Sequence, residues 1–248
     1  MAFWDYDASK FVHDRWEGKD TSRFDRLETL NFINKSFQGC QGSLLEIGCG
    51  TGYWLRQGIW PSESFFGIDS SREMINIARQ SGTRVILADA HSLPFVDNSL
   101  DAVIAVHVLE YSHAPHQFVS EIHRVLKPGG RCCIITKNKF GVPWRLALWL
   151  AGRFATNPLK FNCPTLDDIL MWWGSSSFIN VTWLSARLIT NLNDVNDAVT
   201  FSLPPGIERA ALSLAKFLKP MLTFGMIGRS LAWHIGLILE KQPSGVTN

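Results

Sequence analysis

Short apolar runs alternate with amphipathic segments through the middle of this 248-residue chain. Such continuous apolar runs are typical of parallel strands that are buried on both faces of a sheet. The first run ends at glycines, the second at Asp69 and the third at Asp89, as strands do when they leave the core. The runs predict five strands, at residues 44–47, 65–68, 85–88, 103–108 and 132–136.

Helical patterns lie between the predicted strands. The sequence SSRE at residues 70–73 is a capping box that predicts a helix start, and Pro115 suits the first turn of another helix. The sequence KPGG at residues 127–130 predicts the end of that helix and a turn into the fifth strand. Before the first strand, a capping-box-like start at Ser22 and Asp25 predicts a helix whose apolar face carries Leu27, Leu30, Ile33 and Phe37.

This alternation predicts an α/β fold in which a doubly wound, mostly parallel sheet is covered by helices on both faces. The length suits one domain. We expect an N-terminal helical segment at 1–42 and a ligand-binding core at 43–138. Residues 139–164 and 187–231 are predicted to form a lid. A helix at 165–173, a strand at 178–184, a helix-rich stretch at 205–222 and a last strand at 233–239 complete the prediction.

Composition narrows the class of protein. A hydrophobic share of 46% and a charged share of 19% indicate a folded globular chain, and a net charge of +2 gives no reason to expect nucleic acid as a partner. The five cysteines form no CxxC pair and no cluster with zinc spacing, which predicts reduced thiols, no metal site and a cytoplasmic protein. Asp5 and Asp7 near the start argue against a secretory signal.

The sequence LLEIGCGTG at residues 44–52 joins the first strand to a glycine-rich turn. In an open α/β sheet, ligands bind beyond the carboxyl ends of the strands, and glycine lets the backbone approach a ligand closely. A dinucleotide fingerprint requires glycine where this chain has Tyr53. Glu46 would also repel a pyrophosphate, so it favours a ligand with a positive charge.

Two aspartates end the next two predicted strands. Asp69 suits a ribose diol that donates two hydrogen bonds, and Asp89 can accept one from an exocyclic amine. Either aspartate alone could equally cap a helix or begin a loop. Together with Glu46 they describe a nucleoside that carries a cation, which fits S-adenosylmethionine better than NAD.

The chain resembles the class I S-adenosylmethionine-dependent methyltransferases, within the small-molecule group that includes enzymes of ubiquinone and menaquinone biosynthesis. Four blocks carry the resemblance over residues 43–138: LLEIGCGTG, GIDSSREMINIAR, ADAHSLPFVDNSLDAVIAVHVLEY and EIHRVLKPGGRCCIITKN. It implies a Rossmann-like sheet with an antiparallel last strand, S-adenosylmethionine as cofactor and a small-molecule acceptor. Its implied cofactor-binding residues are Tyr6, Glu46, Gly48, Cys49, Gly50, Gly52, Asp69, Ser70, Met74, Asp89, Ala90 and His107.

The sequence says less about the methyl acceptor than about the cofactor. His107 and His113 follow the fourth predicted strand and are the candidate catalytic bases for a hydroxyl acceptor, although a loop histidine is commonly only solvated. An enolate, phenolate or amine acceptor would need no dedicated base. The predicted lid is apolar and aromatic, with Trp144, Leu146, Leu148, Trp149, Leu150 and Phe154.

Three functions remain open on the sequence. The first is methyl transfer to a small hydrophobic or aromatic acceptor. The second is lipid or quinone methylation at a membrane surface, with peripheral membrane contact. The third is non-catalytic binding of S-adenosylmethionine. Residues 220–239 have the length of a membrane span, but Arg229 at their centre and the expected last strand argue against one. The sequence gives no oligomeric state.

Overall fold

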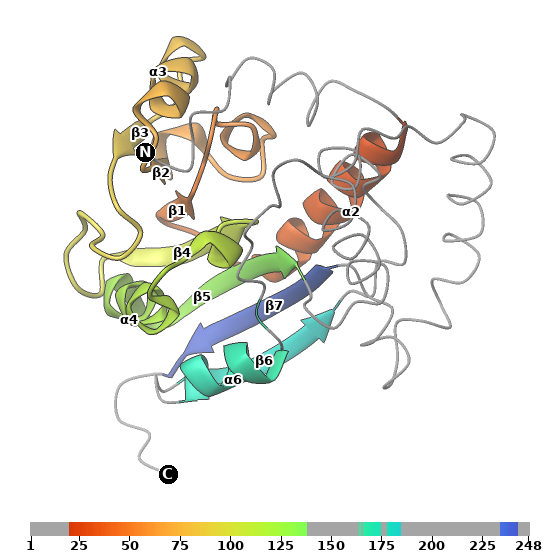
Figure 1. The fold of residues 1–248 in the computed structure, drawn as a ribbon, viewed down its shortest axis with the longest axis vertical. Helices are drawn as coiled ribbons and strands as arrows, with labels where there is room; N and C mark the ends of the chain where they lie inside the picture. The colour runs from red at the N-terminus through yellow and green to blue at the C-terminus, as the bar shows by residue number, and fades with distance from the viewer. Residues whose placement is uncertain (1–19, 138–163, 165, 175–177, 185–233, 243–248) are drawn as a thin grey trace, which may run out of the picture.

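A computed structural model describes residues 20–137, 164, 166–174, 178–184 and 234–242. Their centre is one seven-stranded sheet with the order β3-β2-β1-β4-β5-β7-β6 (Figure 1). Pairing is parallel from β3 through to β5, and β7 runs antiparallel to both of its neighbours. The strands are β1 (Leu44–Ile47), β2 (Phe65–Asp69), β3 (Val85–Leu87), β4 (Leu100–Val106), β5 (Leu126–Lys137), β6 (Phe178–Leu184) and β7 (His234–Lys241). The predicted α/β class and the antiparallel last strand are confirmed.

Helices cover both faces of this sheet. One hydrophobic cluster joins α4 and α6 to side chains such as Leu45 and Val103, and the other joins α2 and α3 to alternate positions such as Leu44 and Ile104. Successive strand residues point to opposite faces of the sheet, and both faces are covered by helices. Apolar residues at every position of a strand are therefore buried, alternately in one cluster and in the other. The helices are α2 (Asp20–Ser36), α3 (Arg72–Gln80), α4 (Pro115–Val125) and α6 (Leu166–Gly174), with short 3₁₀ turns η2 (Trp54–Arg56), η3 (Ser62–Ser64) and η4 (Leu109–Tyr111).

Local sequence accounts for the starts of α3 and α4. The Ser71 hydroxyl accepts a hydrogen bond from the Met74 N–H at 3.3 Å, so a serine of the predicted SSRE start caps α3, one residue later than the spacing of a capping box from Ser70 to Glu73 places it. Pro115 occupies the first turn of α4, where its missing N–H costs nothing. The buried face of α4 then carries Phe118, Val119, Ile122 and Val125.

Several predicted boundaries are wrong in detail. Helix α2 is already helical at Asp20, before the predicted cap, and Leu27 on its predicted apolar face is 50% exposed while Phe32 is buried. Strand β4 begins at Leu100, three residues before the predicted start, and ends at Val106, two residues before the predicted end. The predicted turn at 127–130 lies within the bounds of β5, where the pairing with β4 jumps from Leu126 to Arg131. Residues 127–130 therefore interrupt the pairing between β4 and β5 as a bulge, and they do not form a turn before β5.

The strand order positions a site at one edge of the sheet. From β1 the chain moves outward through β2 and β3 and then returns to β4 on the other side of β1. The connections therefore diverge between β1 and β4, which leaves a crevice beyond their carboxyl ends. The residues that end β1, β2 and β4 meet there.

No helix in the described ranges is both long and apolar enough to cross a membrane. Residues 234–239, the described part of the segment considered above as a span, lie in strand β7. The predicted lid, apart from Pro164, and the predicted helices at 205–222 lie outside the described residues.

Candidate functional site

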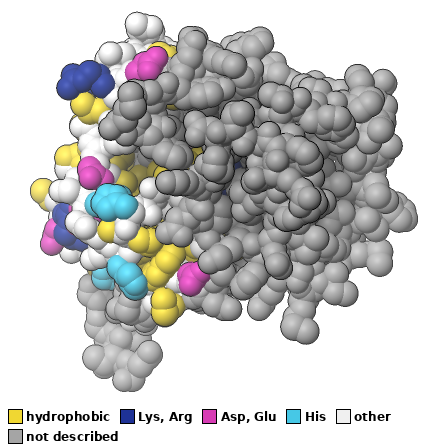
Figure 2. All heavy atoms as spheres, in the orientation of Figure 1, with side chains coloured by type: hydrophobic (Ala, Val, Ile, Leu, Met, Phe, Trp, Pro, Cys, Tyr) yellow, Lys and Arg dark blue, Asp and Glu magenta, His cyan; other side chains and the backbone are white. Residues whose placement is uncertain are grey.

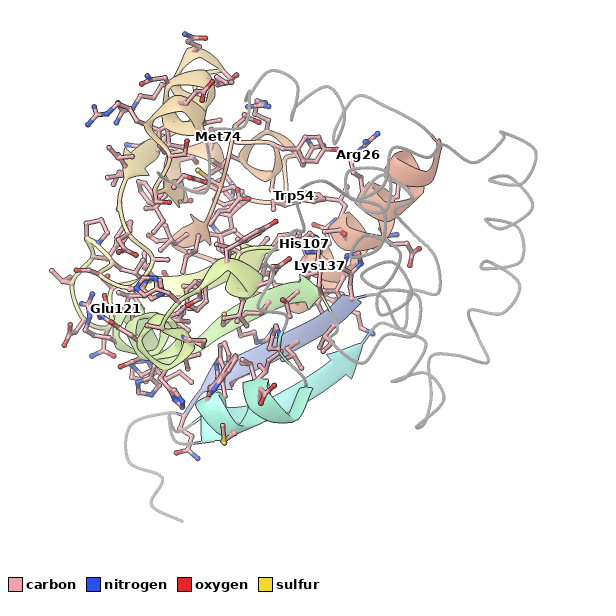
Figure 3. The ribbon with its side chains drawn as sticks, in the orientation of Figure 1. Arg26, Trp54, Met74, His107, Glu121 and Lys137 are labelled. Carbon is pink, nitrogen blue, oxygen red and sulfur yellow. The ribbon has the colours of Figure 1, made fainter. Side chains whose placement is uncertain are left out.

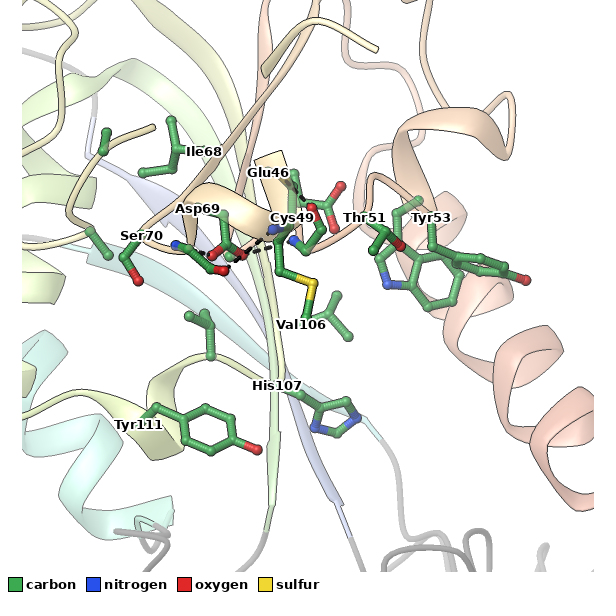
Figure 4. Close-up of a pocket in the computed structure, with 18 residues that line it drawn as sticks. Glu46, Cys49, Thr51, Tyr53, Ile68, Asp69, Ser70, Val106, His107 and Tyr111 are labelled. Carbon is green, nitrogen blue, oxygen red and sulfur yellow. Dashed lines mark hydrogen bonds between the residues drawn. The ribbon is translucent and has the colours of Figure 1, made fainter. Parts of the chain in front are cut away.

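A pocket lies at the carboxyl edge of the sheet, where the strand order reverses (Figure 4). Its walls come from the glycine loop after β1, the end of β2 with the start of α3, the segment after β3, and the end of β4 with η4. Of the predicted residues, the pocket brings together Glu46, Gly48, Cys49, Gly50, Asp69, Ser70, Met74, Ala90 and His107.

Two glycines of the loop are required for different reasons. Gly50 has φ +53°, and a Cβ built there would meet nothing within 4 Å, so its backbone faces open pocket space. Gly48 has φ +68°, and a Cβ there would lie 2.6 Å from Cγ2 of Val108. Gly50 therefore leaves room for a ligand, whereas Gly48 allows the loop to pack on the segment after β4.

Asp69 ties this loop to the start of α3. Its Oδ2 accepts a hydrogen bond from the Gly50 N–H at 2.8 Å, and its Oδ1 accepts one from the Ser71 N–H at 2.8 Å. Burial raises the pKa of the Asp69 carboxyl, and the backbone N–H groups of Ser71, Gly50 and Ser70 only partly oppose that effect. Each oxygen retains acceptor capacity, so the carboxylate can also accept from a diol in the pocket.

Glu46 is a buried carboxylate that lacks a full set of partners. It is 2% exposed, it lines the pocket, and no described residue hydrogen-bonds its Oε2 atom. Burial raises the pKa of Glu46 well above its ordinary value, the charge of Asp69 raises it further, and Arg56 opposes both effects. A cationic hydrogen-bond donor in the pocket would satisfy this oxygen and stabilise its charge.

The turn after β1 is also unsuited to a pyrophosphate. Only the three-residue 3₁₀ turn η2 follows the glycine loop, so the aligned amides of a long helix N-terminus are missing at this place. Glu46 and Asp69 add negative charge to the same wall (Figure 4). Both features disfavour NAD, in agreement with the sequence-based argument from Tyr53.

The opposite side of the pocket carries His107 and Tyr111 (Figure 4). His107 follows β4 with φ +57°, and its Nδ1 lies 3.3 Å from Oε1 of the buried Glu110. Sequence reasoning missed Glu110, although its i,i+3 spacing from His107 in HVLEY was a usable signal. Val106 and Val108 make the wall around them apolar.

Three predicted site residues do not line the pocket. The Oδ1 atom of Asp89 instead accepts a hydrogen bond from the His91 N–H at 2.9 Å and lies 2.7 Å from Nδ1 of the same residue. His91 contacts Ser112 through Nε2 at 2.8 Å, and the His113 ring packs 4.2 Å from the His91 ring. Gly52, with φ +77°, lies against Thr83.

The roles that the resemblance implies for Asp89, Gly52 and His113 stay predictions, and the structure gives these residues the contacts described above. Asp89 orders the segment after β3, and the backbone hydrogen bond from His91 lowers the pKa of Asp89, with smaller opposition from burial. His113 supports His91 and does not line the pocket with His107. Burial raises the pKa of Cys49, so this thiol is not an activated nucleophile. Tyr6 lies outside the described residues.

Within the described part of the chain, no group of three or more histidine, cysteine or acidic side chains could hold a metal ion. The donor set of the pocket instead consists of two carboxylates, backbone groups and an apolar wall. This set fits a nucleoside with a cationic amino group better than a metal or a polyphosphate.

Comparison with known proteins agrees with this fit. Residues 45–134 match a family model described as a methyltransferase domain. The demethylmenaquinone methyltransferase of Lactococcus lactis subsp. lactis is 31% identical over 150 residues, which cover 54% of this chain and 55% of the relative. The chloroplastic 2-methyl-6-phytyl-1,4-hydroquinone methyltransferase 1 of Oryza sativa subsp. japonica is 27% identical over 193 residues, covering 73% of this chain and 54% of the relative.

The fold comparison extends over more of the chain. The crystal structure of geranyl diphosphate C-methyltransferase from Streptomyces coelicolor, in complex with Mg²⁺, geranyl diphosphate and S-adenosyl-L-homocysteine, superposes with a TM-score of 0.58 at 18% identity. The match covers 88% of this chain and 79% of that one. The chain spans about half the length of the two curated relatives described above.

Proposed function

This chain belongs to the class I S-adenosylmethionine-dependent methyltransferases, and we propose that it transfers a methyl group to a small hydrophobic or aromatic acceptor. S-adenosylmethionine, the cofactor of this class, supplies a methyl group that its sulfonium already activates. The protein must then bind the cofactor, align the acceptor with it and exclude water, which is where proximity is most effective.

This proposal rests on one observation: the pocket places the buried carboxyl of Glu46 next to the open space at Gly50. Glu46 offers a buried oxygen that no described residue hydrogen-bonds and that suits the amino group of the methionine portion. Gly50 leaves its backbone accessible beside it, and Asp69 can accept from the ribose hydroxyls. Met74 and Ala90 supply apolar surface for the adenine.

The acceptor class is inferred from the other wall of the pocket. Val106, Val108 and Tyr111 offer apolar and aromatic contacts beside His107. On the described part of the face seen in Figure 2, basic and acidic side chains are scattered among hydrophobic and uncharged ones and form no broad basic surface. Both features support a small apolar acceptor over a nucleic acid.

A quinone or lipid acceptor at a membrane surface is the second candidate. Two relatives are named for demethylmenaquinone and for a phytyl hydroquinone, and this favours a prenylated ring among apolar acceptors. Methyl transfer to a prenylated 1,4-naphthoquinol with an unsubstituted ring position, with and without phosphatidylglycerol vesicles, separates the two candidates. Stimulation by vesicles and co-sedimentation with them support the membrane candidate, and indifference to vesicles supports a freely dissolved acceptor.

Calorimetric titration with S-adenosylmethionine and S-adenosylhomocysteine tests the proposal. We expect micromolar binding by the natural chain and a loss of at least tenfold in Gly50→Val, whose side chain would fill the ligand space. Gly82→Val is the matched control, because Gly82 has φ +75° and open surroundings but does not line the pocket. Equal losses in both variants would mean that backbone strain, and not pocket space, decides binding.

Binding alone would not distinguish the enzyme from a non-catalytic cofactor-binding protein. Transfer of a labelled methyl group to a panel of apolar phenols, quinols and amines makes that distinction. Cofactor binding without transfer to any member of the panel would favour the non-catalytic alternative. Failure of the natural chain to bind either nucleoside would sink the proposed function.

A further inference from the structure

His107 is held in a backbone conformation that few non-glycine residues adopt. Its φ of +57° places it in the left-handed region directly after β4, at a cost on the order of 1 kcal/mol. Its N–H donates a hydrogen bond of 2.7 Å to the carbonyl oxygen of Ile135, which anchors this turn to β5. The turn places the imidazole at the pocket wall, where its side chain is 11% exposed.

A fully buried carboxylate lies behind this imidazole. Glu110 is 0% exposed, its Oε1 lies 3.3 Å from Nδ1 of His107, and its Oε2 accepts a hydrogen bond from the Thr136 hydroxyl at 2.9 Å. Lys137 is also buried, at the end of β5, and its positive charge acts on Glu110; Figure 3 labels Lys137 and His107. Both oxygens of Glu110 thus have described side-chain partners.

The contacts of Glu110 favour an ionised carboxyl, since its Oε2 accepts from Thr136. Burial raises the pKa of Glu110, but the hydrogen bond to His107, the charge of the protonated His107 and the charge of Lys137 together outweigh burial, and the pKa is lowered. When the protonated imidazole loses its other proton to the pocket, the hydrogen bond to Glu110 keeps the proton on Nδ1. An ionised carboxylate only accepts hydrogen bonds, so Nδ1 of His107 must carry the proton between them. In the neutral imidazole, Nε2 is then left as an acceptor.

The surroundings of His107 leave that acceptor available. No described residue forms a hydrogen bond with Nε2, and the neighbouring ring of His234 packs against the imidazole with centroids 4.5 Å apart. Among the described residues, the titratable groups that surround His107 are Glu110 from η4, Lys137 from β5 and His234 from β7. Of these groups only His107 lines the pocket.

We propose that Glu110 is a positioning residue that holds His107 in the Nδ1–H form, so that Nε2 accepts a proton from a hydroxyl group on the acceptor. The inference rests on the proposed function and narrows it to acceptors with an aromatic or enolic hydroxyl. As the O–H bond breaks, its proton forms a bond to Nε2 and the oxygen becomes the nucleophile. That oxygen forms the O–CH₃ bond while the methyl–sulfur bond breaks and its electron pair goes to sulfur.

This role separates acceptors that need a base from those that do not. A naphthol is protonated at neutral pH, whereas the matching aromatic thiol ionises far more readily and arrives as a thiolate. General bases typically contribute about 10²- to 10⁴-fold in rate. Loss of the base should therefore slow transfer to the hydroxyl and leave transfer to the thiol nearly unchanged.

The kinetic test compares 1-naphthol with 1-naphthalenethiol as probes. We expect His107→Ala to lower kcat for 1-naphthol by about 100-fold or more and Glu110→Gln by about tenfold, with KM little changed and thiol methylation within about twofold. The controls are His116→Ala and Glu63→Gln, which alter exposed residues outside the pocket. Equal losses for both probes would indicate a structural role and overturn the proposal, as would unchanged naphthol methylation.

A second measurement needs no turnover, and its deciding result comes from the natural protein. Nitrogen-15 NMR of histidine-labelled natural protein, with S-adenosylhomocysteine bound, reports which ring nitrogen of His107 carries the proton. We expect the proton on Nδ1, and in Glu110→Gln a mixture of both tautomers, because an amide can donate as well as accept. A proton on Nε2 in the natural protein overturns the proposal even if neither naphthalene probe is methylated.

The two proposals fail in different ways. A chain that binds neither S-adenosylmethionine nor S-adenosylhomocysteine contradicts the proposed function. A chain that binds the cofactor but holds His107 with its proton on Nε2, or methylates thiol and hydroxyl with equal dependence on Glu110, contradicts only the positioning role.

Discussion

At the scale of single residues, one buried acid lies in the pocket wall and another lies behind it, with opposite electrostatic settings. Glu46 is buried, its Oε2 has no hydrogen-bond partner among the described residues, and the pKa of its carboxyl is raised. Glu110 is buried with partners on both oxygens, and the pKa of its carboxyl is lowered. Glu46 can therefore bind a cationic group of a ligand, whereas Glu110 interacts with the neighbouring His107 side chain.

Glu46→Gln should weaken binding of S-adenosylmethionine by about ten- to a hundredfold. The amide keeps the size of the side chain but removes the charge, and hydrogen bonds to charged groups contribute about 1.5–3 kcal/mol. Calorimetry measures the change, with the exposed Glu63→Gln as control. Equal affinity in the two variants would show that Glu46 does not face the amino group of the cofactor.

Stability of the ligand-free chain should fall as the pH rises above the ordinary pKa of glutamate. Because the pKa values of Glu46 and Asp69 are raised in the folded protein, the folded state binds protons more tightly than the unfolded chain in that range. Urea unfolding at about pH 5 and about pH 8 checks this sign. Glu46→Gln should lose less stability than the natural chain over the same interval, and parallel curves would contradict the assignment.

At the scale of the elements, long-range polar contacts fix how helices meet the sheet. The Lys241 ammonium, at the end of β7, donates hydrogen bonds of 2.7 Å to the carbonyl oxygens of His123 and Leu126 and one of 2.8 Å to Oδ1 of Asn98. These carbonyls end α4, where a cation also complements the helix dipole. Lys241 thus caps the C-terminal end of α4, which lies more than a hundred residues earlier in the chain.

Lys241→Met should lower the free energy of unfolding by about 1–3 kcal/mol, because the carbonyl oxygens at the end of α4 would lose their donor. Lys35→Met, an exposed change in the last turn of α2, is the control and should have little effect. Chemical denaturation measures both variants. A loss in Lys241→Met no larger than in the control would mean that water replaces the ammonium without cost.

At the scale of the whole molecule, the last strand of the chain lies inside the sheet. β7 inserts between β5 and β6 and pairs with β5 over the register from Arg131 to Lys137. β5 in turn places Ile135 and Thr136 behind His107 and Glu110. The late part of the chain therefore supports the acceptor side of the pocket, although the family model matches only residues 45–134.

Leu237→Ala should cost about 2–5 kcal/mol, because Leu237 is 0% exposed and pairs in register with Ile134 in the core. Leu27→Ala is the control, and its 50% exposure predicts a change within about 0.5 kcal/mol. Thermal and urea unfolding compare the two variants. Similar costs would mean that β7 packs on the sheet without contributing to its stability.

The sequence by itself determined the features that depend on neighbouring residues. Apolar runs, the capping serine of α3, Pro115 and the glycine loop act over one strand or one helical turn, and the structure confirms each of them. Glu46, Gly50 and Asp69 were also predictable, because the carboxyl ends of parallel strands must meet at one edge of the sheet.

Only the tertiary structure decided the features that depend on distant partners. Asp89 contacts His91, a partner that its place after β3 does not predict, and Leu27 is exposed because α2 packs through Phe32 instead. The role of Glu110 became visible once β5 brought Thr136 and Lys137 behind η4. Periodicity gives a residue's place along an element, but the direction of packing between elements follows from contacts that local sequence does not contain.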